Sequence, residues 1–319
     1  MALIRDLAVQ GAEMLLVLIL APLVTGVVRK FKARLLRRVG PPLIQPYREL
    51  ARLLRKEVVL ADNASWLFRA APYLIFAATW VAAALVPTFA VGLVFSWSAD
   101  LIAIVALLGS ARFFLALAGM DVGTSFGGIG SSREVMIASL AEPAMIMIIF
   151  ALALLAGSTQ LSTIAAYMLS PHVGLRVTLA MALVAIIMVG IAENARVPID
   201  NPTTHLELTM VHEAMVLEYS GRHLALIELS AELKLLLYLS LIACVFLPWG
   251  LAPPGAGWSA YALGASSYVA KLMAGAIALA FFETAIAKMR VFRIPGFLGA
   301  ALMLGLLGTL FLFVSRGGL

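Results

Sequence analysis

Long apolar runs recur along the whole chain and are separated by short polar stretches. A helix of ~20 residues crosses the ~30 Å hydrocarbon core of a bilayer. The sequence therefore predicts one all-α integral membrane domain over residues 1–319. We expect about eight transmembrane helices, at about 10–28, 70–92, 99–120, 134–157, 174–193, 224–249, 262–287 and 296–315.

The polar stretch after the first run carries a second helical pattern. In PPLIQPYRELARLLRKE, the residues Leu43, Tyr47, Leu50 and Leu54 recur at helical spacing, while the basic residues lie away from them. This pattern predicts an amphipathic helix at about 46–57 on the cytoplasmic membrane surface. Anchoring to lipid and docking of a cytoplasmic partner both remain open as its role.

Composition and charge agree with a membrane protein. The chain is 63% hydrophobic with a mean hydropathy of +1.03, which excludes a soluble globular domain. Its net charge of +6 does not indicate nucleic-acid binding, because 17 of the 23 Lys and Arg residues fall in loops on one side of the eight predicted spans. By the positive-inside rule those loops face the cytoplasm, and both termini face outward.

The sequence offers little for redox chemistry. The single cysteine, Cys244, cannot supply the four thiolates of an iron–sulfur cluster. The GGIG stretch at 127–130 is predicted to lie in a loop between two spans, without the preceding strand that a dinucleotide site needs. Ser131 and Glu134 fit a capping box at the start of the fourth span. We expect no metal or cofactor in this chain.

Ionisable residues inside the predicted spans are the first functional candidates, since a charge at the bilayer centre is costly. Arg112 and Glu142 lie at similar depth on the third and fourth spans, and we expect them to pair. A purely structural ion pair and a station on an ion path both remain open.

The sixth span carries a second group of charges. Glu228 and Glu232 are four residues apart and share a helix face, while Lys234 points elsewhere. Together with Arg112 and Glu142 they predict a half-channel rising from the cytoplasmic side. A position of Glu228 at headgroup level is the alternative. Glu283, near the inner end of the seventh span, also joins the predicted path, although an interfacial position is the simpler interpretation.

The acidic loop, residues 194–222, is unusually polar for this chain. Two interpretations compete. The first is a solvated loop helix that contacts another subunit. The second is a metal site built on His205 and His212, although the sequence after His212 lacks the second His of an HExxH motif. The coupling residues that we predict in and beside this loop are Glu193, Asp200, His205, Glu207, His212, Glu213, Glu218 and Arg222.

Three segments together resemble a known family: GPPLIQPYRELARLLRKE, SSREVMIASLAEP and PIDNPTTHLELTMVHEAMVLEYSGR. They look like the membrane subunit of formate hydrogenlyase and hydrogenase-4-type complexes, which are group 4 membrane-bound NiFe hydrogenases. That subunit is related in turn to the complex I subunit that contacts the peripheral arm. The resemblance covers essentially the whole chain.

The resemblance implies a non-catalytic subunit of an oxidoreductase complex in the prokaryotic inner membrane. It implies that this subunit anchors a cytoplasmic arm of hydrogenase large and small subunits, whose NiFe centre and iron–sulfur clusters are not in this chain. It also implies antiporter-like membrane partners and translocation of protons or sodium. Relative to complex I, Thr203, Thr204 and His205 replace an acid-rich stretch after Pro202, which argues against a quinone site.

Two other functions stay open from sequence alone. A quinone-site subunit of a complex I-type NADH dehydrogenase predicts quinone-dependent activity. A stand-alone secondary ion transporter predicts activity from this polypeptide by itself, and such proteins often contain internal repeats, which are not evident in this sequence.

Overall fold

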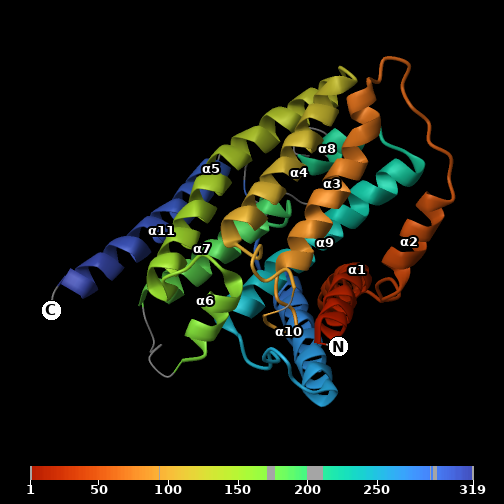
Figure 1. The fold of residues 1–319 in the computed structure, drawn as a ribbon. Helices are drawn as coiled ribbons and strands as arrows, with labels where there is room; N and C mark the ends of the chain where they lie inside the picture. The colour runs from red at the N-terminus through yellow and green to blue at the C-terminus, as the bar shows by residue number, and fades with distance from the viewer. Residues whose placement is uncertain are drawn as a thin grey trace.

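A computed structural model of the chain describes residues 2–92, 94–170, 177–199, 211–287, 289 and 293–317. These residues form helices joined by loops, with two isolated β-bridges and no sheet (Figure 1). The helices are α1 (Ala2–Leu35), α2 (Gln45–Leu54), α3 (Trp66–Leu85), α4 (Leu101–Asp121), α5 (Ser125–Ala156), α6 (Leu161–Met168), α7 (Val177–Glu193), α8 (His212–Val216), α9 (Gly221–Phe246), α10 (Trp258–Ala285) and α11 (Ile294–Gly317).

Seven helices of the described chain are long and apolar enough to cross a membrane: α1, α3, α4, α5, α9, α10 and α11. The prediction at 174–193 coincides with α7, an apolar helix of 17 residues. At ~1.5 Å per residue it is about 26 Å long, slightly short of the hydrocarbon core. The prediction of an all-α integral membrane protein is confirmed, and the chain is a multi-pass membrane protein.

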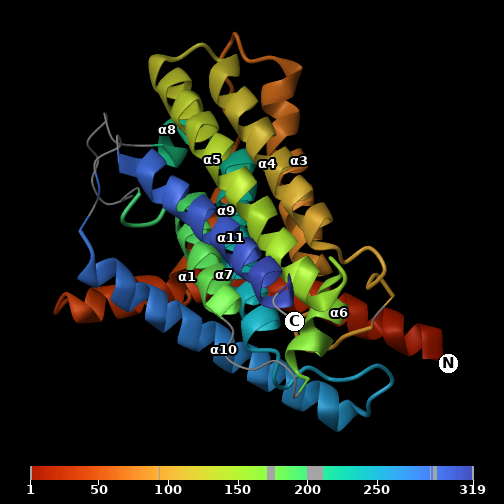
Figure 2. The same ribbon diagram turned by 90° about the vertical axis from the view of Figure 1, so that its left-hand side faces the viewer.

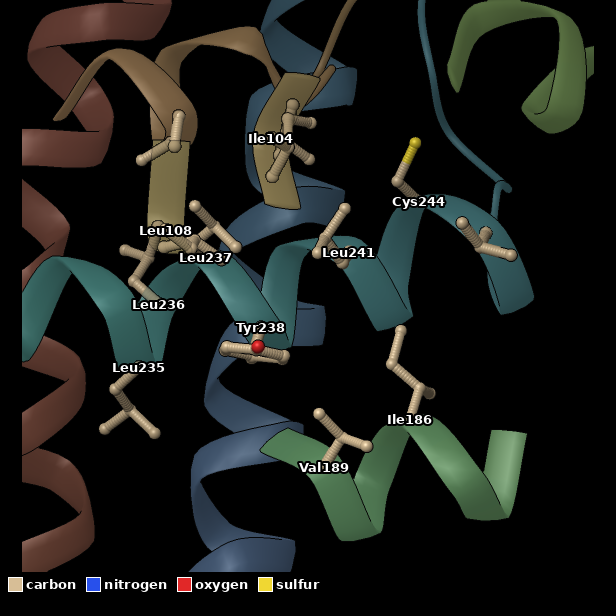
Figure 3. Packing of buried hydrophobic residues seen from close by; sticks show 14 of the residues in the cluster. Ile104, Leu108, Ile186, Val189, Leu235, Leu236, Leu237, Tyr238, Leu241 and Cys244 are labelled. Carbon is tan, nitrogen blue, oxygen red and sulfur yellow. The ribbon is translucent and has the colours of Figure 1, made fainter. Parts of the chain in front are cut away.

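The helix α9 forms the centre of the bundle. It has the largest buried share among the seven long apolar helices, and it packs against α1, α2, α3 and α7. Figure 3 shows Ile104 and Leu108 of α4 on one side of it and Ile186 and Val189 of α7 on the other. Around this centre, α3, α4 and α5 lie side by side, and α11 packs against α5 and α7 (Figure 2).

The beginning of α5 differs from the prediction. The helix begins at Ser125, with Thr124 as its N-cap: the Thr124 hydroxyl accepts a hydrogen bond from the Gly127 amide. GGIG is therefore helical rather than a loop, and the predicted capping box of Ser131 and Glu134 is wrong, because both residues lie inside the helix. The Ser131 hydroxyl instead donates a 2.9 Å hydrogen bond to the Ala116 carbonyl of α4.

The glycines of α5 let its backbone approach α4 closely. A Cβ atom built on Gly127 would lie 2.0 Å from the Gly119 carbonyl oxygen, whereas one built on Gly128 meets nothing within 4 Å. Small residues permit this kind of contact between membrane helices.

We expect Gly127→Ala to destabilise the assembled protein by about 1–3 kcal/mol, because two backbones must separate. Gly128→Ala is the matched control and should be neutral or stabilising by up to ~1 kcal/mol, since alanine favours helix. Thermal unfolding of the purified complex in mild detergent compares the two variants. Equal melting temperatures would contradict the close contact.

The amphipathic helix predicted at about 46–57 is α2, which ends three residues earlier than expected, at Leu54. It lies against α1 and α9. The Glu49 carboxylate accepts a 3.0 Å hydrogen bond from Arg29 of α1, and the Tyr47 hydroxyl donates to the Ile19 carbonyl. These contacts hold α2 beside the bundle. The helix α2 forms one wall of a cavity described below.

Candidate functional site: a buried charge cluster

Arg112 is the centre of a charge cluster inside the bundle. It is buried on α4, and each of its three guanidinium nitrogens faces a different carboxylate. Nε lies 3.3 Å from Glu134 Oε1, Nη1 lies 3.4 Å from Glu142 Oε1, and Nη2 contacts Glu193 Oε1. The predicted pairing of Arg112 with Glu142 is confirmed, and it is one of three such pairs.

The three carboxylates differ in their access to the surface. The side chains of Glu134 and Glu193 are 9% and 4% exposed, whereas that of Glu142 is 44% exposed. Glu142 faces a large groove between α4 and α5, with a volume of about 730 Å³ and a mainly apolar lining that includes Phe113 and Phe150. The cluster therefore opens sideways, at one carboxylate, toward the outside of the bundle.

Lys234 of α9 joins this cluster from the opposite side. It lines a cavity of about 30 Å³ together with Arg112, Glu134 and His212. A polar cavity of this size is large enough to hold an ordered water. Two basic side chains, Arg112 and Lys234, thus lie among three carboxylates, and with all five ionised the cluster carries one negative charge in excess. One additional proton or cation would neutralise it.

Glu228 and Glu232 lie elsewhere. As predicted, the two share one face of α9, but this face lines a different cavity, of about 240 Å³, between α1, α2 and α9. Lys234 faces the Arg112 side of the same helix. The structure therefore divides the predicted half-channel into two groups on opposite sides of α9.

Glu283 lies near the C-terminal end of α10, and its side chain is buried rather than exposed to headgroups. One carboxylate oxygen accepts a 2.9 Å hydrogen bond from Lys32 of α1, and the other accepts a 3.3 Å bond from Arg196, which follows α7. Three segments that are far apart in sequence meet at this carboxylate. Its geometry indicates a structural connection between α1, α10 and the segment that follows α7.

The described part of the acidic loop approaches the charge cluster. Glu193, which ends α7 just before the loop, contacts Arg112, and His212 lines the small cavity beside it. Glu213 lies in the first turn of α8, while Glu218 and Arg222 are exposed. The remaining predicted coupling residues, Asp200, His205 and Glu207, lie outside the described residues, so the two-histidine metal hypothesis stays untested.

The EYSGR segment has a clear local role. The Tyr219 ring stacks on Phe68 at a centroid distance of 4.0 Å, and its hydroxyl donates to the Phe68 carbonyl. Burial, and secondly the nearby Asp121 carboxylate, raise the pKa of Tyr219, so the hydroxyl keeps its proton. Ser220 exchanges two hydrogen bonds with the Val59 backbone. The segment therefore attaches the start of α9 to the loop between α2 and α3.

Gly221 is required at the next position by conformation and by space. Its φ of +55° lies in the left-handed region, and an added Cβ would lie 2.4 Å from the Glu57 carbonyl oxygen. The close packing of α9 on the first loop thus explains a glycine in this motif.

Two buried carboxylates were missed by sequence reasoning. Glu134 was interpreted as a helix cap, although its position eight residues before Glu142 places it on the same long helix. Glu13 lies inside the first predicted span, and that alone could have identified it. Its carboxylate accepts hydrogen bonds from the Phe89 and Ala90 amides, at 3.4 and 3.1 Å, and so holds the loop after α3.

With this geometry in place, the chain can be compared with known proteins. The sequence profile of a protein family described as NADH dehydrogenase matches residues 9–314, nearly the whole chain. The chain belongs to this family. The resemblance inferred from the loop motifs is thereby confirmed at the level of the family.

Two curated relatives locate the chain within this family. It is 33% identical to formate hydrogenlyase subunit 4 of Escherichia coli (strain K12) over 280 residues, which cover 88% of this chain and 90% of that protein. It is 35% identical to hydrogenase-4 component C of the same organism over 245 residues, covering 76% of this chain and 75% of that protein. Both names agree with the resemblance to formate hydrogenlyase and hydrogenase-4-type complexes that the sequence motifs indicated.

A solved structure shares the fold. The chain is similar to a chain of the membrane-bound sulfane sulfur reductase, an archaeal respiratory membrane complex, with a TM-score of 0.81. The match covers 97% of this chain and 98% of that chain at 18% sequence identity. At this identity the likeness demonstrates the architecture alone.

Proposed function

We propose that this chain is the membrane-anchoring, ion-translocating subunit of a membrane-bound hydrogenase of the formate hydrogenlyase type. The observation that carries the proposal is the Arg112 cluster. It is a group of ionisable side chains buried in the membrane domain of a protein whose relatives are formate hydrogenlyase and hydrogenase-4 components. Intramembrane ionisable residues that pair with one another commonly mark ion pathways.

In the proposed path, charge passes from the acidic loop to the groove between α4 and α5. Glu193 ends the helix that leads into the loop, Arg112 contacts it, and Glu142 contacts Arg112 and opens into the groove. A change of charge in the cytoplasmic arm would shift the loop carboxylates, then Glu193, and then the proton or sodium ion held at Glu142. The steps from Glu193 through Arg112 to Glu142 act between charges in direct contact, where a low dielectric strengthens the interaction.

The predicted members Glu228, Glu232 and Glu283 do not carry this proposal. The first two line a separate cavity, and Glu283 is held between two cations. The cluster that we assign to the path adds Glu134 and Glu193 to the predicted Arg112, Glu142 and Lys234.

The proposal includes partners and an orientation. The cytoplasmic partners are a hydrogenase large subunit with the NiFe centre and a small subunit with iron–sulfur clusters, docked on the acidic loop. Antiporter-like subunits would lie beside this chain in the cytoplasmic membrane. Both termini would face outward, because the basic loops then face the cytoplasm.

The test is purification of this chain with its native complex in mild detergent. We expect nickel and iron to co-purify and the complex to evolve hydrogen from reduced viologen. A quinone-linked complex without nickel would overturn the proposal in favour of the complex I-type function, which the family description also allows. Ion transport by the isolated polypeptide in vesicles would overturn it in favour of a stand-alone transporter.

A further inference from the structure

The cavity between α1, α2 and α9 contains a buried carboxylate oxygen that lacks a hydrogen-bond partner. Glu232 is 7% exposed, and its Oε2 atom is buried without a donor among the described residues. A buried ionised oxygen is costly unless a donor or cation meets it. Because Glu232 lines a cavity of about 240 Å³, the missing partner has room to bind there.

The charges around the cavity indicate what this partner carries. Three carboxylates line it, of Glu49, Glu228 and Glu232, with two guanidinium groups, of Arg29 and Arg52. Arg29 and Glu49 pair with each other at 3.0 Å. Glu228 and Glu232 therefore make the α9 side of the cavity negative, while Arg52 makes the α2 side positive, and each side would attract a group of the opposite charge.

A bare metal ion does not fit this description. Across the described residues, no group of three or more His, Cys, Asp or Glu side chains is placed to hold one. The cavity is also about eight times the ~30 Å³ that one water occupies in the liquid. The space suits an organic cation of several non-hydrogen atoms.

The position of the cavity indicates where such a cation comes from. One wall is α2, an amphipathic helix, and Leu50, Leu53 and Leu224 supply apolar surface beside the charges. Helices of this kind lie at the level of the lipid headgroups. Arg52 is exposed at the edge of the cavity. A phosphate group near Arg52 and an ammonium group near Glu232 would together match the charge pattern across the cavity.

We propose that this cavity binds the headgroup of a phospholipid with a primary ammonium group, such as phosphatidylethanolamine. The ammonium donates to Glu232 Oε2 and to Glu228, and the phosphate accepts from Arg52. A primary ammonium has three N–H donors, whereas the trimethylammonium of phosphatidylcholine has none and phosphatidylglycerol lacks the cation. The site therefore selects for the amine itself.

Native mass spectrometry of the purified complex tests this proposal. The complex is delipidated and then exposed in turn to phosphatidylethanolamine, phosphatidylcholine and phosphatidylglycerol with identical acyl chains. We expect phosphatidylethanolamine to be retained at least about tenfold more than either alternative, as hydrogen bonds to a charged group allow. Equal retention of the three lipids would overturn the proposal, and this comparison requires no variant.

A variant pair locates the site. Glu232→Gln should lower retention of phosphatidylethanolamine by about tenfold, whereas Glu57→Gln, an exposed carboxylate in the same cytoplasmic loop, should leave it unchanged. Retention unaffected by Glu232→Gln would also overturn the proposal. Because binding is measured without turnover, the result does not depend on whether the Arg112 cluster conducts ions.

Discussion

Replacing Arg112 with methionine should prevent stable assembly of the protein. The substitution removes the ion-pair partner of Glu134 and Glu193, which are 9% and 4% exposed, and leaves Lys234 as the remaining basic side chain of the cluster. Breaking one buried ion pair costs about 3–5 kcal/mol, a large share of the ~5–15 kcal/mol that stabilises a typical protein. We therefore expect little folded chain to accumulate.

The measurement is the amount and melting temperature of the complex purified from membranes. Arg55→Met, at an exposed position just past the end of α2, is the matched control and should behave like the unmodified protein. The double variant Arg112→Met with Glu193→Gln should recover part of the lost stability, because it removes one uncompensated charge. A stable Arg112→Met complex would show that the carboxylates are held neutral without the arginine.

The hydrophobic pattern was sufficient to locate the membrane helices, because in a bilayer each helix satisfies its own backbone hydrogen bonds. Their ends were harder to predict. The helix α5 begins nine residues before the predicted start at 134, since polar and glycine residues such as those at 125–133 can extend a helix beyond the hydrocarbon. Because of this extension, Glu134 lies inside the helix and is an ion-pair partner of Arg112 rather than a helix cap.

Depth along two helices was enough to predict the pairing of Arg112 with Glu142. Periodicity was likewise enough to place Glu228 and Glu232 on one face, away from Lys234. What sequence could not supply was the packing around α9, which decides which neighbour each face meets. The Lys234 face meets Arg112 and Glu134, while the acidic face meets α1 and α2. A set of charges that looked like one path therefore separates into two sites.

Because the packing of the helices could not be predicted, the partners of Glu193 and Glu283 could not be predicted either. Their partners, Arg112 for the first and Lys32 and Arg196 for the second, are remote in sequence, and the ion pairs exist only because α4, α7, α1 and α10 converge. Local spacing has no access to such contacts. In both cases the sequence identified a candidate residue but not the basic residue that compensates its charge.

Replacing Glu142 with glutamine should separate hydrogen evolution from ion movement. The amide keeps the size of the side chain and an oxygen for Arg112, but it cannot exchange a proton near neutral pH. Because the amide still accepts a hydrogen bond from Arg112 and brings no unpaired charge into the apolar groove, the complex should assemble. This makes Glu142 a cleaner test of conduction than the fully buried Glu134 or Glu193.

We expect Glu142→Gln to lower ion movement into inverted membrane vesicles by about tenfold or more, because removing a proton-transfer group typically costs at least that factor. Hydrogen evolution from reduced viologen should persist, since in the proposed complex the metal centres belong to other subunits. Glu57→Gln is the control for a lost surface charge and should retain both activities.

If Glu142→Gln moves ions at the normal rate, Arg112 and Glu142 are a structural pair, and the ions cross the membrane elsewhere in the complex. If both activities fall together while the assembled complex is recovered in the normal amount, the groove between α4 and α5 is required for turnover itself.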